Sequence, residues 1–480
     1  MQQRLNSCTG HADKTFDVSK GVVGRESPLG GNRVSSNTQR LSLSITFWRM
    51  TTMLKQVKYP YSAAGAVGLA AADSRPASGS GSGSKAGSTA GIAGMTAAGL
   101  AAKWEQDGWR QLRTPGAYEC WHFDAMDAVG SGVSVDLYDG LPMHPRYVQE
   151  LNRYYRSKKH HQLSSVREQA LPAFYPAAAI SLFQGGRCLV RSFNWYPPGS
   201  FKGERGSPEI AVGPNRITLR QDGSIGLVAR GYPMEPSVLL PRHRKDQFVL
   251  VELTLHPTFS CTPLVQPLRP AAEDGVEHSW IVSAPHCKVS GRVQHISASD
   301  DIMLVDMPMQ GLGFHDHFFG GSGMLRGIRS LSRGRVLGDD WAVIWNAVDG
   351  VPPGRLSTNS VAIYQAGADP VVIEHPETHV VSARTSGSLV RYPATLDMHG
   401  GDARGNNVEL LVHHETILET TPWSVRGNCS IQLQNRDQRR LMGRGLIETI
   451  SSRHLRLPVI SDRARRAILS IDADDPLWRQ

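Results

Sequence analysis

The chain has 480 residues, 40% of them hydrophobic and 20% charged, and a formal net charge of +9 at pH 7. This length and composition suffice for two ordinary domains with hydrophobic cores. The positive charge lies at the beginning, where residues 1–103 hold twelve Lys or Arg against four acidic residues. The rest of the chain carries 40 basic and 39 acidic residues, so we expect no nucleic-acid partner for the body.

The first part of the chain has the composition of a disordered leader. Residues 1–52 mix polar and basic residues without apolar periodicity, and residues 63–102 are rich in Ala, Gly and Ser. Such segments cannot bury enough apolar area to offset the entropy of ordering, so we expect residues 1–103 to be a disordered basic leader. The run from Met53 resembles a signal peptide but is interrupted by Pro60. We therefore expect a cytoplasmic protein, with export as the alternative.

A membrane-spanning segment is not expected. No stretch reaches the roughly 18 uninterrupted apolar residues that a spanning helix needs. Any membrane association is therefore expected to be peripheral, at the inner membrane.

Two short segments near the start of the body, residues 119–128 and 134–140, predict β-strands. In residues 119–128, Trp121, Phe123 and Ala125 alternate with His122 and Asp124. This period of two predicts a strand with one aromatic face. The rings of this face either bind a ligand or pack in the hydrophobic core.

The following segments are mostly short apolar runs separated by Gly, Pro and Asp-Gly. Asp222-Gly223 predicts a tight hairpin turn inside residues 216–231. The main predicted helix covers residues 145–162, where tyrosines and a leucine share one face. The pattern as a whole is typical of β-barrels or sandwiches. The further predicted strands lie in residues 247–257, 341–353, 360–383, 406–420 and 428–436.

A polar, Pro-containing stretch at residues 267–279 lies near the middle of the predicted ordered region. We place a domain junction there. The sequence thus predicts a first β-barrel domain over residues 104–275 and a second over residues 276–480.

The most distinctive segment is Gly311–Gly321, which reads GLGFHDHFFGG. If it is a strand, His315 and His317 point to one side and Asp316 to the other. Histidines beside a carboxylate and aromatic rings form a plausible acid–base centre in a dry pocket. The alternative is that a histidine packs in the core and Asp316 bonds to backbone amides.

We expect neither a metal nor another cofactor. The His-x-His pair could supply two metal ligands, but the other histidines have no diagnostic spacing: His286, His295, His413 and His414. The six cysteines are far apart and include no Cys-x-x-Cys pair, which disfavours structural zinc and a disulfide scaffold. A single disulfide remains open.

Three segments together resemble the carotenoid 1,2-hydratase or hydroxyneurosporene synthase family, to which fungal pericyclases are related. They are WHFDAMDA, the tract from Trp280 into APHCKVSG, and GFHDHFFGG, and the resemblance covers roughly residues 104–455. It implies two tandem lipocalin-like antiparallel β-barrels. It also implies a small apolar substrate, a carotenoid or another isoprenoid.

The chain departs from the family pattern at the string Gly-Tyr-His-Asp-His-Asn-Trp-Gly. Phe314 and Phe319 stand where the family has Tyr and Trp, which keeps the ring but loses a hydrogen-bond donor. The family's later Tyr-x-Asp corresponds here to Ile344 through Asn346, and an amide cannot act as a general acid. Asp349, just downstream, is an alternative acid.

The resemblance implies addition of water to an isoprenoid C=C bond. Such an enzyme needs an acid to protonate the double bond and aromatic faces to stabilise the resulting cation. Two other functions remain open, a pericyclase or isomerase and a non-catalytic binder of an apolar ligand. The expected catalytic positions are His315, Asp316, His317 and Asn346. The expected substrate-binding residues are Phe314, Phe318, Phe319, Trp345, Trp121 and Phe123.

Overall fold

A computed structural model describes the body of the chain. The expected leader, residues 1–103, lies outside the described residues. All described residues belong to one compact unit. The described ranges are 104–158, 164–235, 241–259, 264–269, 278–299, 302–350, 358–402, 404–405, 407–435 and 440–478.

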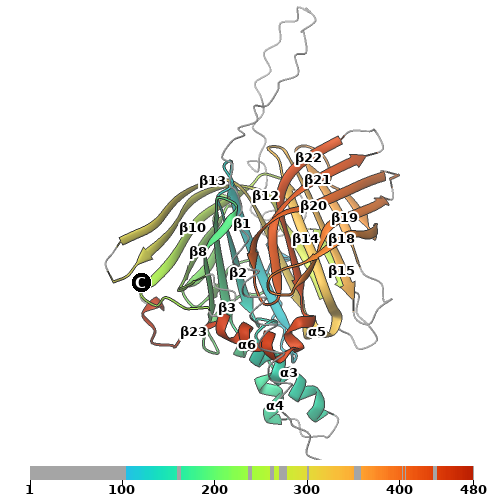
Figure 1. The fold of residues 1–480 in the computed structure, drawn as a ribbon. Helices are drawn as coiled ribbons and strands as arrows, with labels where there is room; N and C mark the ends of the chain where they lie inside the picture. Colours follow the sequence, from blue (N-terminus) through green and yellow to red (C-terminus); the bar gives the residue numbers. More distant parts are fainter. Residues whose placement is uncertain are drawn as a thin grey trace, which may run out of the picture. The chain divides into compact units, whose positions relative to one another are not determined.

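The described chain is mainly β, as predicted, and its strands form two curled sheets (Figure 1). The first sheet runs in the order β23-β4-β3-β2-β1-β13-β12-β10-β8-β7-β6-β5, with β9 and β11 attached to β4 and β12. Its strands are antiparallel except for the pair β23 and β4. They are β1 (Tyr118–Asp127), β2 (Gly132–Asp139), β3 (Ala177–Gln184), β4 (Arg187–Trp195), β5 (Phe201–Gly203), β6 (Ile210–Val212), β7 (Asn215–Leu219), β8 (Ile225–Gly231), β9 (Pro233–Met234), β10 (Gln247–Pro257), β11 (Leu264–Arg269), β12 (His278–Ser297), β13 (Ile302–Gly320) and β23 (Leu469–Ser470).

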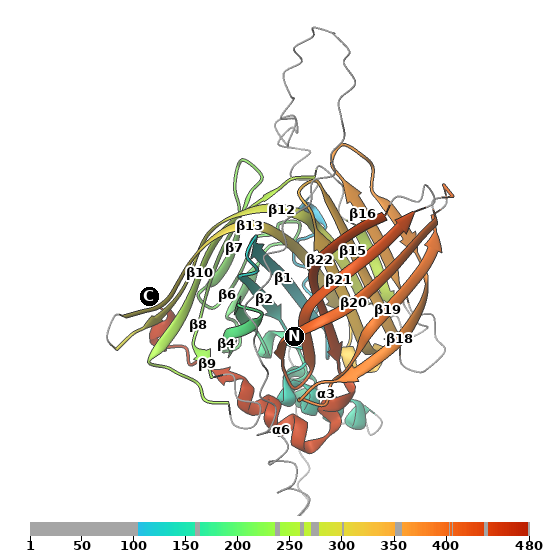
Figure 2. The ribbon, with the colours of Figure 1, turned by 45° about the horizontal axis from the view of Figure 1, so that its top comes forward.

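The second sheet runs in the order β17-β16-β15-β14-β22-β21-β20-β19-β18 and is antiparallel (Figure 2). Strands from its two halves also approach each other, since β17 contacts β19. Its strands are β14 (Ile328–Leu337), β15 (Trp341–Gly350), β16 (Ser360–Gln365), β17 (Val371–Glu374), β18 (Glu377–Thr385), β19 (Arg391–Gly401), β20 (Asn407–Thr420), β21 (Ser424–Asn435) and β22 (Arg440–Ser451).

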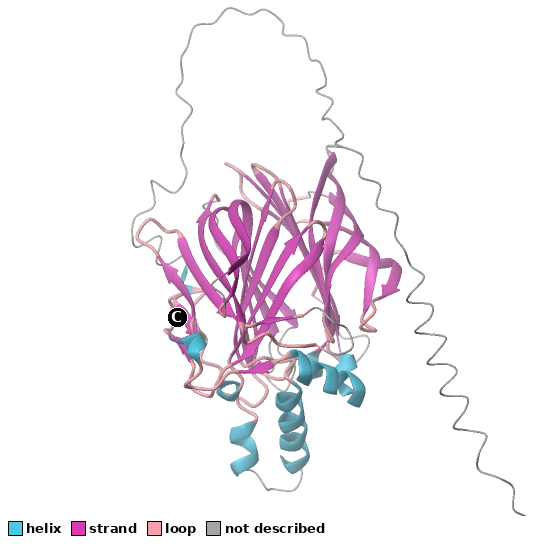
Figure 3. Cartoon of the chain, turned by 60° about the vertical axis from the view of Figure 1, so that its left-hand side comes forward, coloured by secondary structure: helices cyan, strands magenta, loops and turns pink. Residues whose placement is uncertain are grey.

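The helices are short and gather near one end of the strands (Figure 3). The predicted helix is confirmed as α3, which buries Tyr147, Val148 and Leu151. Among the described residues, no helix is both long and apolar enough to cross a membrane. The helices are α3 (Pro145–Lys158), α4 (Ser164–Gln169), α5 (Met324–Gly327) and α6 (Pro458–Ala467), with 3₁₀ turns η1 (Pro172–Phe174), η2 (Arg453–Arg456) and η3 (Pro476–Trp478).

The predicted hairpin between residues 216 and 231 is confirmed as β7 and β8. Gly223 adopts a φ of 79°, which favours glycine, and the Asp222 carboxylate accepts a hydrogen bond from the Ser224 backbone N–H at 2.9 Å. The turn residues therefore set this connection locally.

The chain passes from the first sheet to the second after β13. β12 and β13, residues 278–320, complete the first sheet, and β14 opens the second. The division of the chain into domains at residues 275 and 276 remains a prediction.

Both faces of β1 and of residues 313–320 of β13 are largely buried because each face meets a different core. One core lies within the first sheet and includes Trp121 and Phe123. Another lies between the two sheets and includes Phe314 and Phe318. A third, with Trp345, lies within the second sheet. Each fully buried large side chain contributes about 1.5–3 kcal/mol.

Candidate functional site

The His-Asp-His segment lies near the C-terminal end of β13, which pairs with β1 and β12. In the register of β1 and β13, Trp121 is opposite His317 and His122 is opposite Asp316. Residues opposite one another in a sheet share a face. The two histidines therefore lie on the face of the first core, and Asp316 lies on the face that meets the second sheet. The three side chains do not enter one common hollow.

On the first face the histidines surround a carboxylate that the sequence analysis did not select. His315 Nε2 lies 2.8 Å from Asp107 Oδ2, and His315 Nδ1 lies 3.0 Å from the His122 carbonyl oxygen. The nearest carboxylate oxygens to His317 belong to Glu119 at 3.4 Å and Asp107 at 3.8 Å. We call His315, His317, Asp107 and Glu119 the histidine cluster. All four side chains are buried.

Three of the predicted aromatic residues lie against the histidine cluster. His317 stacks on Trp121 with ring centroids 4.3 Å apart, and His315 stacks on Phe123 at 3.9 Å. The Phe319 ring lies 5.3 Å from that of His317. Among the described residues, neither ring nitrogen of His317 makes a hydrogen bond.

The electrostatic setting of His315 favours its protonated form. Burial by itself would lower the pKa of His315, but the charge and hydrogen bond of Asp107 outweigh it and raise that pKa. The contact with Asp107 therefore stabilises the imidazolium form of His315.

On the opposite face, Asp316 is held by two donors. Its two carboxylate oxygens each lie 2.9 Å from Arg333 Nη1, and Trp280 Nε1 donates to Oδ2 at 2.9 Å. Burial raises the pKa of Asp316, and the Arg333 charge opposes that effect. Asp316 thus joins β13 of the first sheet to β14 of the second.

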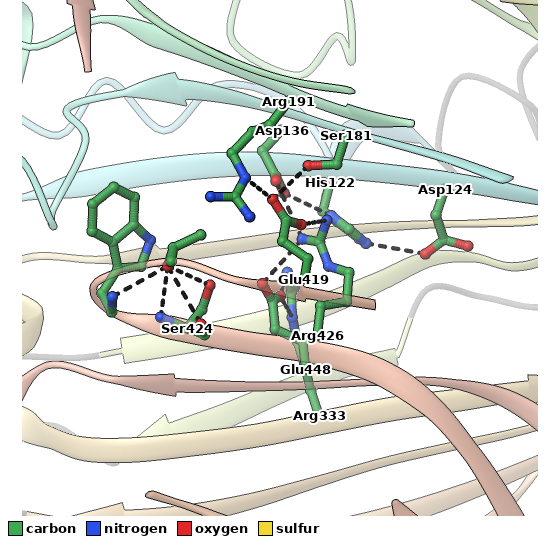
Figure 4. Close-up of polar contacts among 12 residues, drawn as sticks. His122, Asp124, Asp136, Ser181, Arg191, Arg333, Glu419, Ser424, Arg426 and Glu448 are labelled. Atoms are coloured by element: carbon green, nitrogen blue, oxygen red, sulfur yellow. Dashed lines mark hydrogen bonds and ion pairs between the residues drawn. The ribbon is translucent and has the colours of Figure 1, made fainter. Parts of the chain in front are cut away.

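Arg333 belongs to a larger group of buried ionisable side chains between the sheets, which we call the inter-sheet network. Side chains of β1–β4 point toward side chains of β14 and β20–β22, and ion pairs link them (Figure 4). Every member is at most 8% exposed. The members are Asp124, Asp136, Asp316, Glu419, Glu448, Arg191, Arg333, Arg335, Arg426 and His122.

His122 bridges two carboxyl groups of this network. Its Nδ1 lies 2.6 Å from Asp136 Oδ1 and its Nε2 lies 3.0 Å from Asp124 Oδ2. Burial lowers the pKa of His122, and the charges of Arg333 and other guanidinium groups lower it further. Burial raises the pKa of Asp136.

A small hollow lies at one edge of the inter-sheet network. It measures about 20 Å³, enough room for about one water molecule. We call it the inter-sheet hollow. Acidic, basic and aromatic side chains meet there, and the flexible Met143 and Met324 form part of its wall. Its other lining residues include Asp136, Tyr138, Phe318, Arg333, Trp423 and Glu448.

The remaining predicted residues lie apart from the histidine cluster. Phe314 packs between the sheets, below the guanidinium of Arg335 at 5.3 Å. Trp345 packs in the core of the second sheet. Asn346 donates from Nδ2 to Ser360 Oγ at 3.0 Å and to Gln266 Oε1 at 3.2 Å. This amide joins β15 to β16 and β11.

A larger pocket of about 900 Å³ lies in the second sheet. Its wall combines apolar residues such as Val380 and Leu396 with hydroxyl groups such as Ser332 and Thr449, and Tyr392 contributes a ring. None of the ten residues that the sequence analysis selected lines this pocket.

Sequence analysis missed most of the residues that surround the selected ones. Asp107 is separated from His315 by 208 positions, and nothing in its local sequence marks it. The sequence of β14 did contain a usable signal for this polar interface. Arg333 and Arg335 lie two positions apart in a strand that is mostly buried. A charge repeated at period two on a buried strand indicates a polar interface.

Fold and site together define a mainly β protein of two curled sheets with a buried acid–base network between them. The predicted family resemblance is confirmed: the chain is similar to a Chlorobaculum tepidum protein named hydroxyneurosporene dehydrogenase. The two are 24% identical over 365 residues, which cover 72% of this chain and 85% of that protein. No protein-family model matches the chain.

Solved structures with partial similarity include three proteins. A putative AttH from Nitrosomonas europaea has a TM-score of 0.46 at 12% identity, covering 72% of this chain and 94% of that one. CghA with Sch210972 has a TM-score of 0.41 at 11% identity, covering 70% and 89%. Kievitone hydratase from Nectria haematococca has a TM-score of 0.39 at 11% identity, covering 70% and 89%.

Proposed function

We propose that this protein is a hydratase-like enzyme that adds water to an isoprenoid C=C bond, with its reaction centre at the inter-sheet hollow. One observation carries the proposal: buried carboxyl groups and the aromatic rings of Tyr138, Phe318 and Trp423 meet at a single hollow. The hollow has room for about one water molecule, so the proposal requires the flexible side chains of Met143 and Met324 to move aside when the alkene enters. The sequence similarity to a protein named for hydroxyneurosporene supports an isoprenoid substrate.

The chemistry of hydration matches this lining. A carboxylic acid donates its proton to the less substituted carbon, the π bond breaks, and a tertiary cation forms. The faces of Phe318 and Trp423 stabilise such a cation. A water molecule then forms the C–O bond and returns a proton to the carboxylate, so the net change is the addition of one water.

The selected residues receive different roles in this proposal. Asp316 positions Arg333, whose guanidinium lines the hollow. His315 and His317 lie on the opposite face, so we propose that they support β13 from the first core. Asn346 has no acid function here.

The test is product analysis with an acyclic carotenoid in detergent. The wild-type protein should yield a product heavier by one water. Phe318→Leu should slow product formation by about tenfold, because it removes the π face and keeps the apolar volume. His317→Ala is the comparison variant. If it abolishes turnover while Phe318→Leu does not, the reaction centre is the histidine cluster and the assignment to the hollow fails.

A second candidate function is favoured by the pocket of about 900 Å³ in the second sheet, a volume typical of small-molecule sites. In that case the protein is a binder of an apolar ligand. Native mass spectrometry then finds the ligand bound and unchanged, whereas an isomeric product indicates a pericyclase or isomerase.

A further inference from the structure

The charges of the inter-sheet network do not balance with every group in its ordinary ionisation state. Its described members comprise five carboxyl groups, four guanidinium groups and one imidazole, joined in one continuous set of ion pairs. With His122 neutral, five carboxylates face four guanidinium groups, so the network carries one net negative charge. A net charge buried between the sheets is strongly destabilising, so we infer that the network binds one additional proton.

The hydrogen bonds of His122 locate this proton. Both of its ring nitrogens lie within hydrogen-bond distance of a carboxyl group, Asp136 at 2.6 Å and Asp124 at 3.0 Å. A neutral imidazole has one donor and one acceptor nitrogen. One of these two contacts therefore needs a proton from the carboxyl group. Each carboxyl group also pairs with a guanidinium group, Asp124 with Arg335 and Asp136 with Arg426 at 3.5 Å. The contact between Asp136 and His122 is the shorter of the two, so we place the proton in that hydrogen bond.

The surrounding groups favour a proton on the Asp136 carboxyl group rather than on the His122 ring. Burial lowers the pKa of His122, and the positive charges of Arg333, Arg335 and Arg426 lower it further. Protonation of His122 is therefore disfavoured. Burial raises the pKa of Asp136, although Arg426 and Arg333 act against it. The other titratable groups that face Asp136 are Cys120, Tyr138, Asp316 and Glu448.

We propose that Asp136, His122 and Asp124 form a proton relay, in which Asp136 is the acid that protonates the substrate at the inter-sheet hollow. Asp136 lines the hollow, whereas the other two residues lie behind it. The catalytic part of this proposal rests on the proposed function.

The relay returns to its starting state in each turnover. The proton first leaves its hydrogen bond to His122 Nδ1 as the Asp136 carboxyl group turns toward the hollow. The Asp136 O–H bond then breaks as a C–H bond forms on the alkene, which leaves a carboxylate and a tertiary cation. The water that captures the cation gives a proton back to Asp136. His122 donates from Nε2 to Asp124 and accepts from Asp136 at Nδ1, so it is a positioning residue that holds the acid toward the hollow.

Infrared spectroscopy of the full chain tests the proton's position without any substrate. The wild-type protein should show the C=O stretching band of a buried carboxylic acid at neutral pH, and Asp136→Asn should lose the component of this band that persists in Asp139→Asn. Asp139→Asn is the matched control, because Asp139 is a buried carboxyl of the same strand on the opposite face. Asp139→Asn should remove only the part of the band that comes from Asp139. If Asp136→Asn does not fold, Asp136→Glu should shift the band. A spectrum without the band, or a band unchanged in Asp136→Glu, overturns the proposal.

Turnover separates this inference from the proposed function. Asp136→Asn should lower kcat by about 100-fold or more with little change in KM, and Asp139→Asn should keep its activity. His122→Gln should keep the carboxylic acid band at a shifted frequency and lower kcat less. Full hydration by Asp136→Asn overturns the relay and leaves the hydratase function standing. A wild-type protein that hydrates no isoprenoid removes the function, while the infrared band still decides where the proton lies.

Discussion

At the scale of single residues, alternation along a strand decides the chemistry of each side chain. Neighbours in β13 meet opposite environments: His315 pairs with Asp107 in the first core, and Asp316 pairs with Arg333 between the sheets. The sequence shows three ionisable residues in a row, but the pleat of the strand separates them into two sites. Adjacency in sequence therefore did not predict a shared function.

Asp139 provides a residue-scale prediction of pH dependence. It is 2% exposed, and burial together with the charge of Glu119 raises its pKa to about 7. In the unfolded chain its pKa is near 3.8. The folded state thus binds more protons between these values, and the stability of the protein falls as pH rises from about 4 to 7.

Asp139→Asn should remove this dependence, because an amide does not titrate and its oxygen can still accept the hydrogen bond from Trp109. We expect the free energy of unfolding of the variant to exceed that of the wild type by a few kcal/mol above pH 7. Near pH 4 the two values should be similar. Urea unfolding followed by tryptophan fluorescence at several pH values measures the difference. If the free energies of unfolding of the two proteins change with pH in the same way, the pKa assigned to Asp139 is wrong.

At the scale of elements, glycines allow β13 to pack closely against its neighbours. A Cβ on Gly311 would lie within van der Waals overlap of the backbone of Met126, at 2.0 Å from its carbonyl oxygen. A Cβ on Gly321, at the other end of the same segment, would meet nothing within 4 Å. The glycines of GLGFHDHFFGG thus differ in role.

Gly311→Ala should destabilise the protein by about 1–3 kcal/mol, because β1 must shift to admit the methyl group. Gly321→Ala should change the free energy of unfolding by less than about 0.5 kcal/mol. Chemical denaturation of both variants makes the comparison. Equal effects at the two positions would refute the close approach of β1 and β13.

Several strands were predictable because they carry a local signal, whereas others, such as β3, β14 and β22, were not predicted. Residues 247–257 alternate apolar and polar side chains and form β10 over that same range. β1 and residues 313–320 of β13 gave a weaker signal, since burial on both faces replaces the alternation of apolar and polar residues with continuous apolar and ionic residues. The separation of residues 360–383 into β16, β17 and β18 follows its turn residues.

At the scale of the whole molecule, the inter-sheet network joins the two sheets. Arg426 of β21 contacts Glu448 and Glu419 in its own sheet and Asp136 in the first sheet. Such buried pairs are poor sources of net stability, but removal of one partner leaves the others without a counter-charge.

Arg426→Met should therefore destabilise the protein by about 3–5 kcal/mol, as measured by urea unfolding. Arg244→Met is the control. Among the described residues, Arg244 forms ion pairs with Glu235 and Asp246 on the exposed surface, so the change should alter stability by less than about 1 kcal/mol. If Arg426→Met loses no more stability than Arg244→Met, the inter-sheet network does not hold the sheets together.

The sequence by itself determined the β class, the turns, the single long helix and the two-sided placement of His315 and Asp316, because strand periodicity and turn chemistry depend on neighbouring residues. Only the tertiary structure decided the partners. Asp107 reaches His315 from 208 positions away, and the carboxyl groups of β1 and β2 meet guanidinium groups of β14 and β21 across two sheets. Ionisation depends on those distant charges and on burial, which no local pattern specifies.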